Sequence, residues 1–329
     1  MPTRAVVLLS GGLDSMLAIR ILQEQGVEVE AVNFQTIFTC CRDNAAQAAH
    51  DLDVRLTVLD QDDDYIELVR RPRYGYGKGA NPCVDCRIYM FERARAFMHE
   101  AGASFVASGE VLGQRPMSQK RRDLDIIAHE SGLDSLLLRP LSALRLPPTR
   151  PEESGQVDRQ RLYAFVGRGR KELIRLAKHL GLKNIPSPST GCALTETTFA
   201  GKVHDLIRVD SHSQRWDFEL LNVGRHLRID AQTKAVVGRN ESENQTLRTM
   251  YRAAQSRGSA LFAPENFAGP TVILVGPPTE AALQTAGGLL LRYTKQFDPE
   301  NAVVARDVEG SLQSVLVHSQ PQSAELATL

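Results

Sequence analysis

Two short segments carry residue types that could do chemistry. The first is the loop Ser10–Ser15, with the sequence SGGLDS, between an apolar run and a segment of helical periodicity. Its two glycines let the backbone turn tightly, so that amides of the loop and of the following helix can face an anion, helped by the helix dipole. The loop lacks the Lys of a Walker A sequence and differs from G-x-G-x-x-G. It therefore predicts a phosphate-binding loop of another type, with a glycine turn capped by Ser as the plain alternative.

The second segment holds cysteines at a spacing that suits a metal. Cys83 and Cys86 form a C-x-x-C pair, Cys192 follows far along the chain, and no His stands at typical ligand spacing from the pair. Structural zinc usually takes four ligands, whereas three thiolates suit a [4Fe–4S] cluster with one open iron. A thioredoxin-like pair would leave Cys192 unexplained, and cysteines packed as small apolar residues are the alternative without a metal. Cys40 or Cys41 could carry a persulfide, although incidental thiols are the favoured interpretation.

Alternating strands and helices must position these segments. Runs typical of strands and of helices alternate in the order 5–9, 15–22, 27–34, 44–52, 54–59, 86–100 and 104–108. This alternation predicts an α/β fold with a doubly wound parallel sheet. After the Pro- and Ser-rich connector 185–191, short β-like runs between turns predict a second, smaller α+β domain. We expect a first domain over residues 1–204 and a second over residues 205–329.

The charges are balanced in total but unevenly distributed. Lys and Arg together number 39, as do Asp and Glu, which excludes a uniformly basic nucleic-acid coat. Between residues 70 and 180, however, there are 21 basic and 12 acidic residues, and 17 of the basic ones are Arg. The planar fork of Arg donates two parallel hydrogen bonds to phosphate. The middle of the chain is therefore predicted to contact an anionic partner, with a merely solvated surface as the alternative.

The apolar runs are short. None approaches the roughly 18 residues of a membrane span, and the N-terminal run is too short for a signal peptide. These features predict a soluble, cytoplasmic protein without a membrane partner. In a reducing compartment the five cysteines are expected to be metal ligands, nucleophiles or core residues rather than disulfides.

The SGGLDS loop resembles the pyrophosphate loop of the ATP-pyrophosphatase (PP-loop) superfamily. Further segments resemble the iron–sulfur-dependent tRNA thiolation enzymes, relatives of tRNA 4-thiouridine and 2-thiouridine synthases. These segments are GYGKGANPCVDCRIYMF (75–91), SGEVLGQRPMSQ (108–119), LLLRPLSALRLPPTRPE (136–152) and STGCALTE (189–196). The resemblance covers roughly residues 1–205. More weakly, residues 221–227 and 237–244 resemble an NFACT-type RNA-binding domain, and paired hairpin turns are the alternative there.

The resemblance implies an ATP-dependent tRNA sulfurtransferase that uses Mg²⁺-ATP and, as sulfur donor, sulfide or a persulfide derived from a cysteine desulfurase. It implies that a [4Fe–4S] cluster is bound by Cys83, Cys86 and Cys192. The nucleotide-contacting residues that it implies are Ser10, Gly11, Gly12, Asp14, Ser15, Phe34, Gly109 and Glu110. Asp14 and Ser15 are the expected catalytic residues, with Asp14 helping to hold Mg²⁺ or a water molecule. Gly109 and Glu110 form a second glycine segment. The basic residues beside it, expected to contact tRNA phosphates, are Arg115, Lys120, Arg121 and Arg122.

Two other functions compete with this one. A PP-loop enzyme could form an amide on a small molecule and bind structural zinc, but the sequence offers no glutaminase-like Cys/His constellation to supply ammonia. A non-catalytic RNA-binding protein would not need an intact SGGLDS loop. The sequence alone decides neither which uridine is modified nor which sulfur donor is used.

Overall fold

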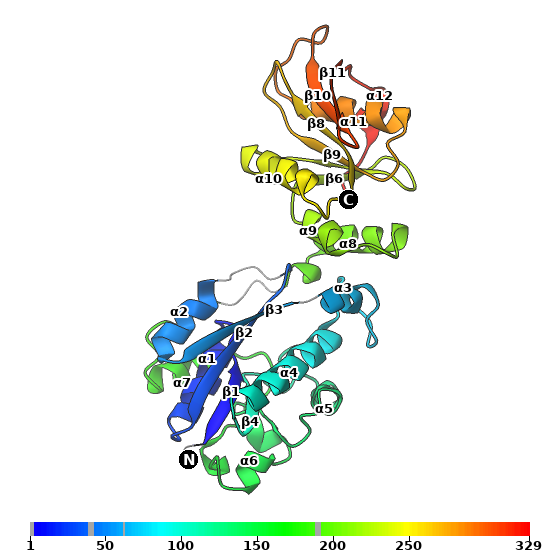
Figure 1. Cartoon of the computed structure of the whole chain (residues 1–329). Helices are drawn as coiled ribbons and strands as arrows, with labels where there is room; N and C mark the ends of the chain where they lie inside the picture. The colour runs from blue at the N-terminus through cyan, green and yellow to red at the C-terminus, as the bar shows by residue number, and fades with distance from the viewer. Residues whose placement is uncertain (1–2, 39–42, 62, 188–191) are drawn as a thin grey trace. The chain divides into compact units, whose positions relative to one another are not determined.

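The computed structural model describes residues 3–38, 43–61, 63–187 and 192–329 (Figure 1). The chain divides into two compact units, residues 1–195 and 196–329. The predicted boundary after residue 204 lies within the helix α8 (Thr197–Val209), and the extent of the functional domains stays a prediction. None of the helices in the described ranges is long and apolar enough to cross a membrane.

The first unit alternates strands and helices. Its elements are, in chain order, β1 (Arg4–Leu8), α1 (Leu13–Gln23), β2 (Glu28–Gln35), α2 (Asp43–Leu52), β3 (Arg55–Asp60), α3 (Asp63–Arg70), α4 (Cys83–Glu100), β4 (Phe105–Ser108), α5 (Arg121–Glu130), β5 (Leu137–Leu138), α6 (Arg150–Glu153) and α7 (Lys171–His179). The strands pair in parallel in the order β3-β2-β1-β4-β5. The strand order reverses at β1, and ligands of open α/β sheets bind at such a switch point, beyond the carboxyl ends of the strands.

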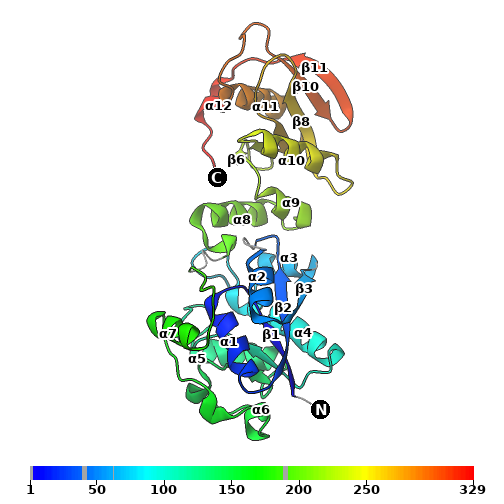
Figure 2. The same ribbon diagram turned by 90° about the vertical axis from the view of Figure 1, so that its left-hand side faces the viewer.

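Side-chain alternation along β1 explains the two layers of helices (Figures 1 and 2). Ala5 and Val7 are buried with residues of α1, α2 and α7, whereas Val6 and Leu8 are buried with residues of α4 and α5. Successive residues of a strand point to opposite faces, so a strand that is apolar throughout is covered on both sides. This arrangement confirms the predicted doubly wound α/β fold.

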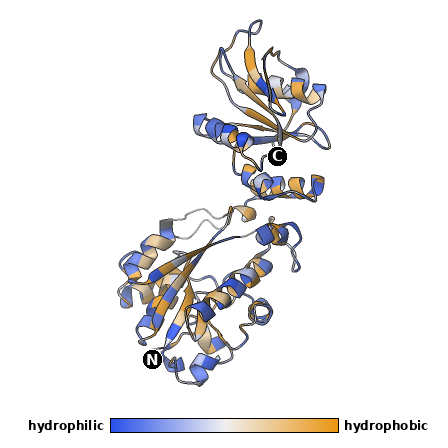
Figure 3. Cartoon of the chain, viewed as in Figure 1, coloured by the Kyte–Doolittle hydropathy of each residue, from blue (hydrophilic) through white to orange (hydrophobic). Residues whose placement is uncertain are grey.

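The second unit is an α+β domain with its own core, as predicted. Its remaining elements are α9 (Arg215–Leu220), β6 (Arg225–Arg228), β7 (Lys234–Val237), α10 (Glu241–Arg252), β8 (Gly258–Pro264), β9 (Val272–Val275), α11 (Glu280–Arg292), β10 (Val303–Val308), β11 (Ser311–Leu316) and α12 (Pro321–Glu325). The strands form an antiparallel sheet in the order β11-β10-β8-β9-β7-β6. One sheet face packs on α11 and the other on α9 and α10. Apolar residues are concentrated in central strands of this unit, such as β8 and β9 (Figure 3).

Two details of the first unit differ from the sequence expectation and affect the site. The helix expected from residue 86 begins at Cys83, so both residues of the C-x-x-C pair lie in its first turn. The sequence pattern predicts no helix over residues 63–70, whereas the structure has the helix α3 there, beginning with Asp63 and Asp64. Its residues Tyr65, Ile66 and Val69 are nevertheless buried on one side, the pattern of an amphipathic helix.

Candidate active site

The SGGLDS loop turns sharply between β1 and α1. Gly11 has φ +75°, and a Cβ atom there would lie 2.5 Å from the carbonyl carbon of Asn44 at the start of α2, so only glycine fits. The Oγ of Ser15 donates to the carbonyl of Gly12 (2.8 Å) and accepts a hydrogen bond from the backbone N–H of Ser10 (3.3 Å). The loop is therefore held in a closed turn at the positive end of a helix, a geometry that suits a phosphate.

The second glycine segment packs directly against this loop. Gly109 follows β4, which pairs in parallel with β1, so both chains leave the sheet at the same edge. A Cβ atom on Gly109 would lie 2.4 Å from both the carbonyl carbon and the carbonyl oxygen of Asp14. The structure thus brings together two segments almost a hundred residues apart in the sequence.

Replacing Gly109 with Ala is expected to destabilise the first unit, because the new methyl group would overlap backbone rather than a flexible side chain. Overpacking of this kind typically costs about 1–3 kcal/mol. Differential scanning calorimetry should show a lower transition temperature for this unit. Gly201→Ala in α8 is the matched control, since a Cβ atom there meets nothing within 4 Å. An unchanged transition in Gly109→Ala would contradict the close packing.

Asp14 is a half-buried carboxylate among donors and positive charges. Its Oδ2 accepts a hydrogen bond from the side-chain amide of Gln114 (2.9 Å). Burial raises the pKa of Asp14, while the Gln114 hydrogen bond and the positive charges of Arg170 and Arg115 act in the opposite direction. A desolvated carboxylate at the end of a phosphate loop is suited to hold a hydrated cation.

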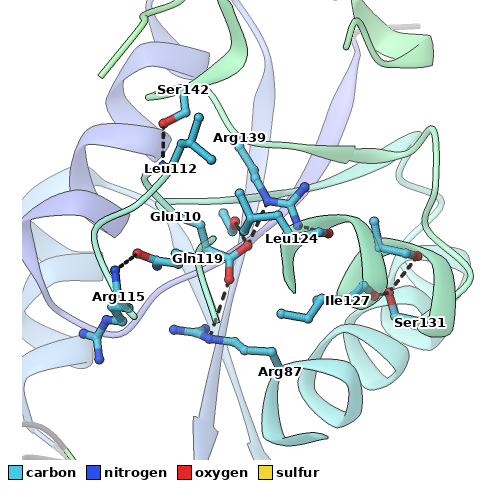
Figure 4. A network of polar contacts seen from close by, with 12 residues as sticks. Arg87, Glu110, Leu112, Arg115, Gln119, Leu124, Ile127, Ser131, Arg139 and Ser142 are labelled. Carbon is cyan, nitrogen blue, oxygen red and sulfur yellow. Dashed lines mark hydrogen bonds and ion pairs between the residues drawn. The ribbon is translucent and has the colours of Figure 1, made fainter. Parts of the chain in front are cut away.

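The side chain of Glu110 lies in an internal network of hydrogen bonds and ion pairs (Figure 4). Its buried carboxylate accepts a hydrogen bond from Arg139 Nε (2.9 Å) and from the Ser108 hydroxyl (3.3 Å), and its other oxygen lies 3.7 Å from Arg87 Nε. Arg139 also donates to the carbonyl of Leu124 (3.1 Å), which joins the segment after β4 to α5. The network holds the second glycine segment in place, and the expected contact of Glu110 with the nucleotide stays a prediction.

The four basic residues expected to contact RNA separate into two groups. Arg115 is an exposed residue whose guanidinium is partly desolvated, which lowers its pKa, while the charges of Cys83, Asp14 and Glu110 act in the opposite direction. It therefore lies within electrostatic reach of both the loop and the cysteine pair. Lys120, Arg121 and Arg122 are exposed at the start of α5, where Arg121 pairs with Asp125 (3.2 Å).

The three cysteines of the expected cluster each have a polar partner. Cys83 Sγ accepts a hydrogen bond from the side-chain amide of Asn81 (3.0 Å). Cys86 Sγ accepts one from the Tyr65 hydroxyl (3.3 Å). The Cys192 thiol donates to the carbonyl of Phe38 (3.9 Å). Cys40 and Cys41, like residues 188–191, lie outside the described residues.

Tyr65 interacts electrostatically with all three thiols and hydrogen-bonds one of them, Cys86. Its side chain is buried and its ring packs against Phe38, with ring centroids 6.3 Å apart. Burial raises the pKa of Tyr65 well above its usual value, and the charges of Cys86, Cys192 and Cys83 raise it further. All three cysteines thus act electrostatically on one phenol, although they come from segments more than a hundred residues apart.

The chemistry of this donor set fits a three-thiolate metal centre. Within the part of the chain that the structure describes, however, no group of three or more His, Cys, Asp or Glu side chains is close enough to hold a metal ion. Burial raises the pKa of Cys86, whereas the Tyr65 hydrogen bond and the charge of Arg87 lower it. The three thiols act electrostatically on Tyr65 but have different hydrogen-bond partners and are not gathered to ligand distance.

Removing the Tyr65 hydroxyl is expected to make Cys86 less reactive. The hydrogen bond from Tyr65 lowers the pKa of Cys86, so Tyr65→Phe should raise that pKa and reduce the thiolate fraction at a given pH. The pH profile of Cys86 alkylation, followed by peptide mass spectrometry in metal-free protein, should shift to higher pH. Tyr89→Phe is the control, because Tyr89 packs on the Tyr65 ring at 5.2 Å but its hydroxyl bonds Asp64. Equal shifts in both variants would rule out the hydrogen bond as the cause.

The sequence did not indicate several residues that lie at the candidate site. Tyr65 lies in the unexpected helix α3, and Gln114 within GQRPMSQ, whose side-chain partner no local pattern indicates. Arg170 directly precedes α7 in the basic, glycine-containing stretch GRGRK, which was a usable signal. Phe34, expected at the nucleotide, lies near the end of β2, half-buried against the core beneath α4 and α5.

The fold and the loop define the class: an open parallel α/β domain with a PP-loop at its topological switch point. Residues 3–130 match the tRNA methyl transferase HUP domain family, and residues 224–327 match the NFACT protein RNA binding domain family. The chain thus combines a domain that matches the HUP domain family with one that matches the NFACT RNA binding domain family, which confirms the resemblance to PP-loop tRNA thiolation enzymes and to an NFACT-type domain. The iron–sulfur cluster stays a prediction.

Curated relatives are tRNA-specific 2-thiouridylases. The MnmA protein of Xanthobacter autotrophicus is 29% identical over 206 residues, covering 57% of this chain and 50% of the relative. That of Sulfurimonas denitrificans is 26% identical over 238 residues, covering 69% of this chain and 65% of the relative. The chain therefore spans between half and two thirds of the length of these relatives. A solved 4-thiouridine synthetase–RNA complex with bound ATP is 20% identical, with a TM-score of 0.36, covering 63% of this chain and 50% of that one.

Proposed function

We propose that the protein is an ATP-dependent tRNA sulfurtransferase that adenylates a uridine carbonyl oxygen and replaces that oxygen with sulfur. The observation that carries the proposal is the closed turn of the PP-loop at the start of α1, with Gly109 packed on the backbone of Asp14, in a chain whose residues 3–130 match the tRNA methyl transferase HUP domain family. A phosphate-binding loop in a chain that also carries a C-x-x-C pair suits a reaction that activates a carbonyl and then delivers sulfur to it.

In the first step the loop would hold the phosphates of ATP. The backbone amides at the start of α1 and the hydroxyls of Ser10 and Ser15 would donate to them, and Asp14 would hold Mg²⁺. The uridine oxygen attacks the α-phosphate, the bond to the β-phosphate breaks, and pyrophosphate leaves. Arg115, expected from the sequence at RNA phosphates, would instead neutralise charge on the α-phosphate.

In the second step a sulfur nucleophile attacks the activated carbon, and AMP leaves with the former carbonyl oxygen. Adenylation is needed because a carbonyl oxygen is a poor leaving group and AMP is a good one. The target base must leave its stack to reach the site. We assign Cys83, Cys86 and Cys192 to a [4Fe–4S] cluster; such a group, when bound, supplies an iron without a protein ligand that can hold sulfide.

The match of residues 224–327 to an RNA-binding domain family supports tRNA as the partner and a role for the second unit in holding it. The rival amide-forming synthetase would not need this domain. A binding protein without activity would not need the closed loop geometry around Gly11.

The test is an anaerobic assay of the full chain with tRNA, ATP, Mg²⁺ and sulfide. We expect tRNA-dependent pyrophosphate release together with a thiolated uridine in the nucleoside digest by mass spectrometry. Omitting the tRNA should stop the release. Pyrophosphate release that depends on a small amine or acid, and not on tRNA, would favour the synthetase instead.

A further inference from the structure

A recess lies in the first unit, and none of the residues expected at the active site lines it. It has a volume of about 570 Å³, and its lining includes the cationic residues Arg145, Arg170 and Lys171. Apolar side chains, among them Phe165 and Val166, also line it. Its volume lies in the range of sites for small molecules and nucleotides.

Two of the three cations lie at the start of α7: Arg170 is the residue before the helix, and Lys171 is its first residue. Gly167 and Gly169 line the recess with their backbone, because they have no side chains. Arg170 Nη2 donates to the carbonyl of Pro186 (3.1 Å), which holds the guanidinium in place. Its positive charge lowers the pKa of Asp14, so the cationic part of the lining is within electrostatic reach of the PP-loop. Three cations and a helix start, opposed by the single acid Glu172, favour an anion.

The apolar wall is held by backbone contacts. Phe165 N–H donates to the carbonyl of Leu141 (2.8 Å), and Ser142 Oγ donates to the Phe165 carbonyl (2.7 Å). The Phe165 ring stacks on Tyr163, with centroids 5.3 Å apart and planes 10° from parallel. Val166 is 56% exposed although it is large and apolar. An ordered aromatic and aliphatic surface beside cations matches the two halves of a nucleotide, its base and its phosphate.

The recess has a contact with the basic start of α5. Arg121 Nη1 donates to the backbone carbonyl of Arg145 (3.3 Å), which lines the recess. Lys120, Arg121 and Arg122 are exposed at the start of α5, so they add positive charge to this part of the first unit.

We propose that this recess holds one nucleotide of the bound tRNA. Its phosphate would be bound by Arg145, Arg170 and Lys171, and its base would pack on Phe165 and Val166. This inference rests on the proposed function for the identity of the polynucleotide. The phosphates of ATP offer the same chemistry to the cations, so the test separates the two sources.

The test compares two double variants of the full chain. Arg145→Ala/Lys171→Ala removes two cations from the recess, and Arg168→Ala/Arg175→Ala removes two neighbouring exposed arginines that do not line it. The affinities for a tRNA transcript and for ATP are measured separately, the first over a salt series. We expect the recess variant to lose about tenfold in tRNA affinity and to have a log–log salt slope shallower by about 1, because the one phosphate in the recess loses two of its three cationic partners. Its affinity for ATP should not change.

The apolar wall is tested by Val166→Glu, which places a carboxylate where the base would pack. Val58→Glu, at a valine on β3 that is 46% exposed, is its control and should bind tRNA like the wild type. We expect Val166→Glu to weaken tRNA binding at least as much as the loss of the two cations does.

Two results would overturn the proposal: tRNA binding by the recess variants equal to that of their controls, or a loss of ATP affinity with unchanged tRNA affinity. Failure of the proposed function gives a different result. A wild-type chain that binds tRNA but never thiolates it would refute the sulfurtransferase, while a loss of tRNA binding by the recess variants would still support the recess.

Discussion

Asp14→Asn and Ser15→Ala are each expected to lower tRNA-dependent pyrophosphate release by about 10²- to 10³-fold, the usual effect of removing one preorganised group from a charged transition state. Asp14→Asn can still accept the hydrogen bond from Gln114 (2.9 Å), so the loss should come from the missing negative charge and its cation. Ser15→Ala removes the hydroxyl that closes the loop onto the Gly12 carbonyl. The measurement is single-turnover release of labelled pyrophosphate from ATP.

The control for both variants is Glu24→Gln, at the opposite end of the same helix α1. It removes an acid from the helix without touching the loop and should release pyrophosphate like the wild type. Circular dichroism and thermal unfolding establish that the loop variants are folded. Near-normal turnover by a folded Asp14→Asn protein would show that this loop does not carry the adenylation.

The second large effect is expected from the cysteines. Replacing Cys83, Cys86 or Cys192 with Ser should stop thiolation and remove the broad visible absorption and the iron from anaerobically purified protein. Pyrophosphate release should persist, because the loop around Gly11 and Asp14 does not involve these thiols. The two groups of variants would thus separate activation of the base from delivery of sulfur.

Cys40→Ser and Cys41→Ser are the matched controls and should keep both the iron and the absorption. Iron and acid-labile sulfide are measured on the same samples as tRNA thiolation. Protein that carries stoichiometric zinc, lacks iron and still thiolates tRNA would reject the cluster. That result would favour a persulfide on Cys40 or Cys41.

Local patterns sufficed to predict the doubly wound sheet and the loop. The apolar run of β1 is buried on both faces. The SGGLDS loop forms a tight turn in which Gly11 has a positive φ, a conformation that glycine favours. Both features depend on residues close together in the sequence, where spacing and backbone preference are informative. The helix α3 could not be predicted, because its eight residues begin with two acidic ones and are too few to show a clear helical periodicity.

The sequence by itself therefore indicated the candidate residues for the chemistry: the loop Ser10–Ser15, the C-x-x-C pair, and an arginine-rich middle. Only the tertiary structure decided what lies beside them. Gly109 meets Asp14 because β1 and β4 are neighbours in a parallel sheet. Tyr65 reaches Cys86 because α3 packs on α4, and the charge of Arg170 acts on Asp14 because α7 packs on α1. These contacts join residues far apart in the chain, and long-range packing leaves no periodic trace in a single sequence.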